Sequence, residues 1–432
     1  MKKIKLNIQK FGQNTTFSES NIDVSRNTSS LTINISFWAP TSQTWFNGKT
    51  LTCSCDGQTQ SASVSLAKGG SVNVSFAFHN IAHNNDGTKS VNWAWSCATG
   101  TSALGTISNS GTKTLTTIAR ASQPSINTWP NNSPDFNIGD TITIHMNRKS
   151  TSFTHNVKLT FGSYNYTIGT NVTDNIKLNT STIADNLYAQ TPNNNIGYGY
   201  ITVDTYNGST YVGSANCSFN AHVVDANPIF SNFTFADTNT KTVALTGNNQ
   251  HCIQGYSNIK GTISTTNKAI AQKKAAMSKY RFTIGTQSVD INYSSTAEVS
   301  GTLNSVPSGV FNMFATDSRN NSTVVMKLAT KVVQYTKPVI NASTITATRD
   351  SGGVGTNCTL KFDGTFWNSN FGKKANSIKI KYQLKKITES TWVDGTTTIT
   401  PTINGNNFSF QGLIARSKDD PSWEISKSYN IK

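Results

Sequence analysis

Asp204-Thr205-Tyr206-Asn207-Gly208-Ser209-Thr210 is the stretch that decides the fold of this chain, and Asp317-Ser318-Arg319-Asn320-Asn321-Ser322-Thr323 echoes it. Each stretch follows an apolar, strand-like run. Asp, Asn, Gly and Ser either hydrogen-bond to their own backbone or accept left-handed backbone angles. A cluster of them between two β-branched runs therefore predicts a hairpin turn, of the kind that is common in antiparallel sheets.

A proline follows each of these turns, at Pro228 and Pro338, and a third one, Pro124, lies upstream. The three prolines are 104 and 110 residues apart. A repeat of this size is typical of a β-sandwich module, and a chain of 432 residues is too long for one hydrophobic core. The sequence predicts an all-β fold, a tandem array of immunoglobulin-like or fibronectin type III-like β-sandwich domains.

The predicted domain boundaries follow the proline spacing. They give an N-terminal arm at residues 1–12, then sandwiches at 13–120, 121–226, 227–336 and 337–432. The last sandwich ends before it reaches a turn like the two quoted above. We therefore expect it to be incomplete at its C-terminus, and we expect the natural polypeptide to continue into a closing strand and a distal region.

Apolar and polar residues alternate in three segments of the first sandwich, which predicts half-buried antiparallel strands. The predicted core faces are Leu31, Ile33, Ile35 and Phe37, then Val72, Val74, Phe76 and Phe78, then Val91, Trp93, Trp95 and Cys97. Further strands are expected at residues 141–145, 157–161, 198–203 and 280–284. Residues 268–277 form the one segment with helical propensity, and we expect one or two helical turns there.

Lysines give the chain a formal net charge of +16 and a pI near 9.5, although only 13% of its residues are charged. They are spread along the whole chain, with no arginine-rich helix and no basic block beside stacked aromatics. Nucleic-acid binding is therefore not expected. A diffuse positive field instead favours association with anionic cell-wall glycopolymers, such as wall teichoic acids, or with an acidic neighbouring protein.

Cysteine and histidine spacing predicts neither disulfides nor a metal site. Cys53 and Cys55 lack the second pair that a zinc site needs, and free thiols in a reducing cytoplasm are expected. His79 and His83 have only Asp86 as a third candidate ligand, and turn chemistry already explains that aspartate. The amino terminus has no apolar segment of secretory-signal length, and no run approaches the length of a membrane span.

A further set of short stretches carries a family resemblance: Lys5–Phe11, His83–Lys89, Leu115–Ser122, Ala315–Asn320, Gly353–Thr356 and Lys361–Asn368. They resemble a family of structural proteins of tailed phages that infect Streptococcus and related Gram-positive bacteria, a family mostly described as of unknown function. The resemblance implies a tail-tip, baseplate or fibre component, assembled in the host cytoplasm without export. It also implies contacts with other tail proteins and a symmetric homo-oligomer, either a trimer or a ring, and it brings no catalytic residue or cofactor.

Three functions compete at this point. The leading hypothesis is a virion tail protein whose sandwiches act as a structural spacer or as an adhesin for host attachment. A cell-wall-degrading tail hydrolase is the second, but no pair of carboxylates and no nucleophile motif stands out. A bacterial surface adhesin is the third, and the missing export signal disfavours it.

Candidate contacts with glycans or the cell wall are aromatic and basic. Trp45 and Phe46 lie in a turn-like segment, as does Trp367 beside asparagines, although aromatics that cap a sandwich end would look the same. Lys379, Lys381 and Lys385 alternate with apolar residues and are predicted to point outward, where such lysines also protect an edge strand from pairing.

Overall fold

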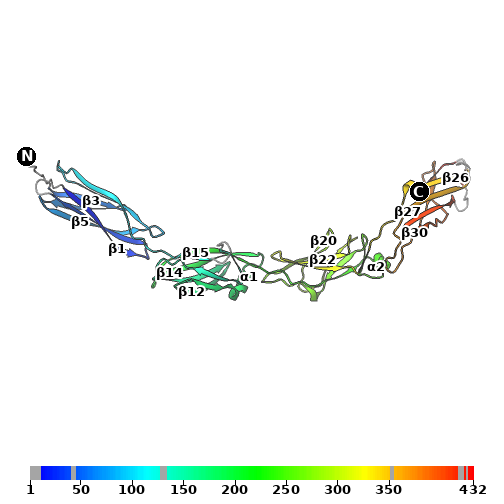
Figure 1. The fold of residues 1–432 in the computed structure, drawn as a ribbon, viewed down its shortest axis with the longest axis horizontal. Helices are drawn as coiled ribbons and strands as arrows, with labels where there is room; N and C mark the ends of the chain where they lie inside the picture. The colour runs from blue at the N-terminus through cyan, green and yellow to red at the C-terminus, as the bar shows by residue number, and fades with distance from the viewer. Residues whose placement is uncertain (1–10, 40–44, 127–133, 351–354, 417–422, 425–426) are drawn as a thin grey trace, which may run out of the picture. The chain divides into compact units, whose positions relative to one another are not determined.

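The computed structural model describes residues 11–39, 45–126, 134–350, 355–416, 423–424 and 427–432. Most of the predicted N-terminal arm, residues 1–12, lies outside these ranges. Strands dominate the described chain, and the helices are short (Figure 1). The chain divides into two compact units, Met1–Val224 and Asp225–Lys432, which are described separately.

The first sandwich packs a three-stranded sheet, ordered β1-β2-β5, against a four-stranded sheet, ordered β4-β3-β6-β7. Its strands are β1 (Gly12–Asp23), β2 (Thr28–Trp38), β3 (Phe46–Cys55), β4 (Gln58–Leu66), β5 (Ser71–Ala82), β6 (Ser90–Ala98) and β7 (Thr106–Thr114). The predicted alternation is confirmed, because Leu31, Phe37 and Trp95 are all buried in a core to which both sheets contribute. Val72 and Val74 are only half-buried and pack at the margin of this core.

The second sandwich repeats this plan with sheets ordered β13-β10-β8 and β12-β11-β14-β15-β9. Its strands are β8 (Ser125–Ile126), β9 (Phe136–Asn137), β10 (Thr141–His145), β11 (Phe153–Phe161), β12 (Tyr164–Val172), β13 (Ile176–Asn179), β14 (Ile196–Asn207) and β15 (Thr210–His222), with η1 (Thr180–Ile183) and α1 (Ala184–Ala189) between β13 and β14. β14 and β15 form the predicted hairpin, with Asn207 opposite Thr210. Gly208 has a φ of 59° in the turn, where a side chain would be strained.

The third sandwich has sheets ordered β16-β18-β21 and β20-β19-β22-β23, and β17 pairs in parallel with β24 at one end. Its strands are β16 (Thr234–Asp237), β17 (His251–Ile253), β18 (Ile259–Ile263), β19 (Met277–Ile284), β20 (Gln287–Asn292), β21 (Val299–Leu303), β22 (Val310–Asp317), β23 (Ser322–Leu328) and β24 (Lys331–Val333), and its helices are α2 (Thr240–Thr246) and η2 (Thr265–Asn267).

The prediction of helical turns at residues 268–277 is wrong. Lys273 and Lys274 have left-handed φ values of 51° and 64°, and the segment leads directly into β19. The Arg319 guanidinium donates hydrogen bonds to the carbonyl oxygens of Gln272 and Lys273. Tertiary hydrogen bonds of this kind override a weak local helix propensity.

The second predicted turn is also confirmed, and a buried carboxylate holds it. Asp317 ends β22, and its Oδ1 accepts the backbone N–H groups of Arg319 at 2.9 Å and Asn321 at 2.8 Å. Thr323, on the other side of the turn, donates from Oγ1 to the Pro228 carbonyl at 2.6 Å. The turn therefore contacts the proline at which this sandwich begins.

The fourth sandwich has one sheet ordered β25-β27-β31-β30, with β26 also paired to β27, and another ordered β29-β28-β32. Its strands are β25 (Val339–Ile340), β26 (Thr346–Arg349), β27 (Cys358–Thr365), β28 (Gln383–Lys386), β29 (Val393–Asp394), β30 (Thr402–Asn404), β31 (Asn407–Ile414) and β32 (Tyr429–Ile431), and η3 spans Ala342–Thr344. Trp423 is buried in its core beside Tyr429.

The order of strands defines the fold class. In the first three sandwiches, one sheet joins the first, second and fifth main strands, and the other is built on the fourth, third, sixth and seventh in that order. This is the two-sheet arrangement of immunoglobulin-like and fibronectin type III-like domains. The chain is an all-β tandem array of such sandwiches, as predicted.

Candidate functional site

Of the two aromatics predicted to contact glycans in the first sandwich, only one is accessible. The Trp45 side chain is 51% exposed, but Phe46 is 2% exposed and packs edge-on against Phe37, with ring centroids 6.5 Å apart. Phe46 is the first residue of β3, and a register shift between Phe46 and Lys49 turns it to the same inward face as the buried Leu51. The prediction of Phe46 as a contact residue is therefore wrong, because the side chain belongs to the core.

Trp367 is not an exposed platform either. Its ring lies 4.7 Å from that of Phe371 and 5.9 Å from that of Tyr335, and it is half-buried. The neighbouring Asn368 and Asn370 are used in turns, where their side chains bond the Gly405 carbonyl and the Gly372 N–H. Trp367 belongs to an aromatic cluster that joins the third and fourth sandwiches.

The lysines of the fourth sandwich lie at the surface. Lys379 and Lys381 are exposed, whereas the intervening Ile380 is half-buried and Tyr382 is buried, so the predicted alternation is confirmed. The regular strand β28 begins only at Gln383, after these two lysines. Both lysines line a hollow of about 410 Å³ between the segment that precedes β28 and the segment that follows β29.

Lys385 faces an aromatic side chain. Its Nζ lies 5.3 Å from the centre of the Trp392 ring, and the Nζ of Lys432 lies 4.3 Å from the same ring. An ammonium group over an indole is attracted by the ring quadrupole. We call Lys379, Lys381, Lys385 and Lys432 the basic face.

Other cations nearby are neutralised. Glu424 accepts from Lys386 at 2.7 Å and from Arg416 at 3.2 Å. The hydrogen bond from Lys386 is the main reason that the pKa of Glu424 lies below its usual value. Glu424 is therefore already engaged by two cations that are not part of the basic face.

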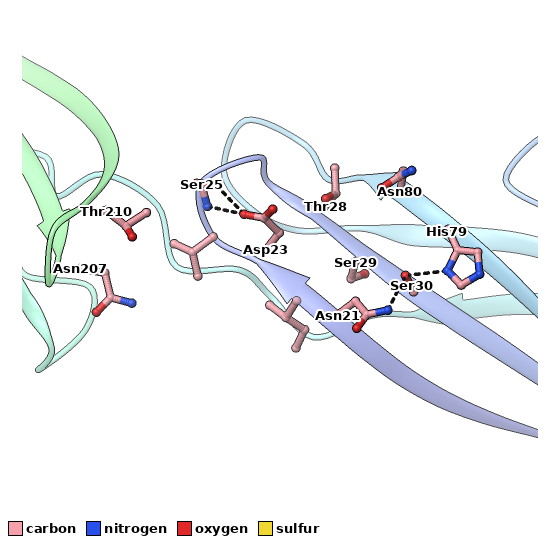
Figure 2. Close-up of a pocket in the computed structure, with 12 residues that line it drawn as sticks. Asn21, Asp23, Ser25, Thr28, Ser29, Ser30, His79, Asn80, Asn207 and Thr210 are labelled. Carbon is pink, nitrogen blue, oxygen red and sulfur yellow. Dashed lines mark hydrogen bonds between the residues drawn. The ribbon is translucent and has the colours of Figure 1, made fainter.

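Figure 2 shows a polar hollow of about 680 Å³, which lies beside the β1–β2 turn. Asp23 accepts hydrogen bonds from the Ser25 N–H at 2.9 Å and from its hydroxyl at 2.6 Å, and these bonds lower the Asp23 pKa. His79 Nδ1 lies 3.2 Å from Ser30 Oγ, and Asn21 also bonds that oxygen. These contacts close the turn between neighbouring strands, so the residues are explained by the fold.

His83, Cys53 and Cys55 are buried. His83 is held by Ser29 Oγ and the Gly87 carbonyl, each at 2.9 Å. All six cysteines are free, and burial raises the pKa of Cys53 to about 12 and that of Cys55 to about 11. Within the described ranges, no three metal-binding side chains gather into one group, and no helix is long and apolar enough to cross a membrane.

Two exposed tyrosines escaped the sequence analysis. Tyr198 and Tyr200 lie on the outer face of β14 and are 67% and 38% exposed. The available signal was the alternation Gly197-Tyr198-Gly199-Tyr200, which places the large residues on one face and only glycine on the other. Whether the tyrosines are exposed depends on which face of the strand is buried, and the sequence alone did not show that.

The fold and these surfaces describe an all-β, multi-domain protein that presents polar, basic and aromatic patches. Residues 2–406 match the model of a family described as "Siphovirus protein of unknown function (DUF859)". The match spans nearly the whole chain, so this chain belongs to that siphovirus family. The predicted resemblance to a tailed-phage family of unknown function is thereby confirmed.

No curated protein matches the sequence. Similar solved structures include a Ca²⁺-stabilised adhesin by which an Antarctic bacterium binds ice (14% identity, 93% of this chain and 92% of that chain, TM-score 0.24). They also include a tetra-tandem repeat from the extending region of a large adhesion protein (12% identity, 98% of this chain and 99% of that chain, TM-score 0.27). A third similar structure is an ectodomain fragment of ICAM-5 (9% identity, 94% of this chain and 98% of that chain, TM-score 0.31). We draw nothing on function from these low scores.

Proposed function

We propose that this chain is a structural component of the siphovirus tail, at the tip, baseplate or fibre, and that it acts as a spacer or an adhesin in host attachment. It assembles in the host cytoplasm with other tail proteins and as a symmetric homo-oligomer. Its work is mechanical and adhesive and needs no catalytic group. Membership of a siphovirus family and the tandem sandwich architecture support this proposal.

The observation that best supports a spacer role is the packed joint within the second unit. Ile253, Val333 and Phe371 form a buried cluster there, surrounded by Leu245, Tyr256, Tyr335 and Trp367. Residues before Pro338 belong to the third sandwich and residues after it to the fourth, so the cluster is shared by both. Shared apolar burial resists bending, because bending would expose these side chains to water.

Backbone contacts reinforce this joint. The Leu245 carbonyl accepts the N–H groups of Lys373 and Lys374, each at 3.0 Å. Gly372 has a φ of 139°, and a Cβ at this position would lie 2.6 Å from the Thr246 carbonyl oxygen. Glycine is required because the two backbones approach so closely. A semi-rigid joint of this kind suits a spacer.

The basic face supports the adhesive part of the proposal. Its lysines are exposed or lie against Trp392, and they would attract the phosphates of an anionic wall polymer. Because surface charges are screened by salt, we expect this attraction to weaken as ionic strength rises.

Two measurements test the proposal. Purified virions are labelled with gold-conjugated antibody against this chain and imaged by electron microscopy, and label on the tail is expected. The purified chain is then incubated with host cell walls, and retention without release of sugar or peptide fragments is expected. Unlabelled virions would refute the structural role, and released fragments would favour the hydrolase alternative.

A further inference from the structure

Strand β14 has an inverted pattern of burial. At the start of a central strand, glycine occupies the two inward positions, Gly197 and Gly199, while tyrosine occupies the two outward ones, Tyr198 and Tyr200. A strand in a sandwich normally places its large apolar side chains inward. This segment does the reverse.

The inner side of this segment is already filled. The rings of Phe161 and Phe219, from the two neighbouring strands, lie parallel with centroids 6.1 Å apart and an interplanar angle of 3°. A Cβ at Gly199 would lie 2.5 Å from the Phe219 ring, and one at Gly197 would lie 2.2 Å from the Phe161 ring. The core therefore needs glycine here, but this need does not explain tyrosine on the outer face.

The outer tyrosines lie among hydroxyl and amide groups. Strand register places Asn165, Thr160, Tyr200 and Ser218 in one row across four adjacent strands. Thr160 Oγ1 donates to Asn165 Oδ1 at 2.8 Å, so the amide is held in this row. Tyr198 lies one row further along, since neighbouring outward positions on a strand are about 6.6 Å apart. We call Tyr198, Tyr200, Thr160, Asn165 and Ser218 the tyrosine face.

Two pairs of ionisable side chains flank the tyrosine face. At one end, Lys158 Nζ lies 3.2 Å from Asp204 Oδ2. At the other end, His222 Nε2 lies 3.5 Å from Asp135 Oδ2. The outward positions between these pairs on β14 are tyrosine or threonine, so the face carries little net charge. A ligand that matches it is uncharged.

We propose that the tyrosine face binds an uncharged polysaccharide chain, through stacking of sugar rings on Tyr198 and Tyr200. The C–H faces of a pyranose are apolar and pack against aromatic rings, while its hydroxyls exchange hydrogen bonds with threonine, serine and asparagine side chains. A sheet surface with two successive rings fits an extended chain better than a single sugar. The inference rests on the proposed attachment role for its biological meaning and adds a neutral glycan to the anionic polymers expected at the basic face.

A structural explanation competes with this one. Aromatic side chains on the surface of a sheet can cover the backbone of neighbouring glycines and stabilise the strand. In that case, removing the rings would lower the melting temperature and leave glycan binding unchanged. The two explanations therefore predict different results for the same variants.

The test uses the full chain and immobilised glucan, galactan and mannan as neutral probes, with polygalacturonate as the anionic probe. Affinity is measured by biolayer interferometry for the wild type, Tyr198→Ala, Tyr200→Ala and the double variant. Tyr211→Ala is the matched control, because Tyr211 is 50% exposed but lies beyond the Lys158–Asp204 pair. Tyr200→Phe keeps the ring, and Ser218→Arg covers the face with a long side chain while leaving both tyrosines in place.

We expect at least one neutral probe to bind, with each alanine substitution weakening binding about tenfold. Tyr200→Phe and Tyr211→Ala should retain binding, and Ser218→Arg should lose it with an unchanged melting temperature. The inference is overturned if no neutral probe binds, if the double variant binds like the wild type, or if polygalacturonate alone binds. Virion labelling is independent of this result, so a chain that binds neutral glycan but is absent from virions would refute only the proposed function.

Discussion

Phe371→Ala removes the central ring of the joint between the third and fourth sandwiches. Phe371 is 6% exposed, and its ring lies 4.7 Å from that of Trp367 and 5.6 Å from that of Tyr335. The joint cluster is separate from the cores of the two sandwiches it connects. The substitution should therefore loosen the joint and leave each sandwich folded.

The magnitude follows from burial. Truncating a fully buried phenylalanine to alanine costs about 3–5 kcal/mol. The neighbours Tyr256, Tyr335 and Trp367 are only half-buried and can collapse partly into the space, so we expect the low end, about 3 kcal/mol. A loss of that size lowers the equilibrium constant for the closed joint by about 100-fold.

Limited trypsin digestion and calorimetry measure the effect. We expect faster cleavage at Lys373 and Lys374, whose backbone N–H groups bond the Leu245 carbonyl across the joint, and melting of the two sandwiches in separate transitions. Phe362→Ala is the control, because Phe362 lies in the core of the fourth sandwich and its loss should destabilise that sandwich itself. Cleavage at Lys373 and Lys374 and melting that match the wild type would show that the cluster does not hold the joint.

Three further outcomes are expected. Cys53 and Cys55 should react slowly with a thiol reagent at pH 8 in the native chain, because their pKa values are raised to about 12 and about 11. All six thiols should react in denaturant, and rapid labelling of this pair in the native chain would contradict their burial. Burial lowers the pKa of His155 below its ordinary value of 6.5, so the neutral ring is favoured in the folded state. The contribution of His155 to the free energy of unfolding should therefore be full above pH 6.5 and fall as the pH drops below it. A His155→Gln variant with the same pH dependence as the wild type would refute the assignment. Gly199→Ala should destabilise the second sandwich by about 1–3 kcal/mol, since its Cβ would meet the Phe219 ring and the Thr160 carbonyl, whereas Ser218→Ala should change little; equal melting temperatures for both variants would contradict this packing.

Local patterns predicted much of the fold. The two Asp-initiated turns, the alternating core faces of the first sandwich and the strands near residues 141–145 and 280–284 all appear in the structure. Turn residues act through their own backbone, and a period of two places side chains on opposite faces whatever surrounds the strand. The helix prediction for residues 268–277 was wrong because Arg319, which is distant in sequence, donates hydrogen bonds to two carbonyl groups of this segment.

The candidate sites depended on packing that residue types do not encode. Trp367 beside asparagines looked like an exposed platform, yet Tyr335 and Phe371 pack against it from segments on either side in the sequence. Simple alternation from the buried Leu51 would point Phe46 outward. The register shift between Phe46 and Lys49 turns it inward, and the sequence pattern did not show that shift. In contrast, the outward lysines Lys379 and Lys381 follow from alternation alone.

The sequence by itself determined that the chain is a series of β-sandwiches, because turn chemistry, strand period and proline spacing are local properties. Only the tertiary structure decided which aromatics are exposed. Gly197 and Gly199 face inward because the rings of Phe161 and Phe219 already occupy the space beneath them, and this leaves Tyr198 and Tyr200 at the surface. Exposure is set by what neighbouring strands bring to each position, and that depends on the register of strands that are far apart in the sequence.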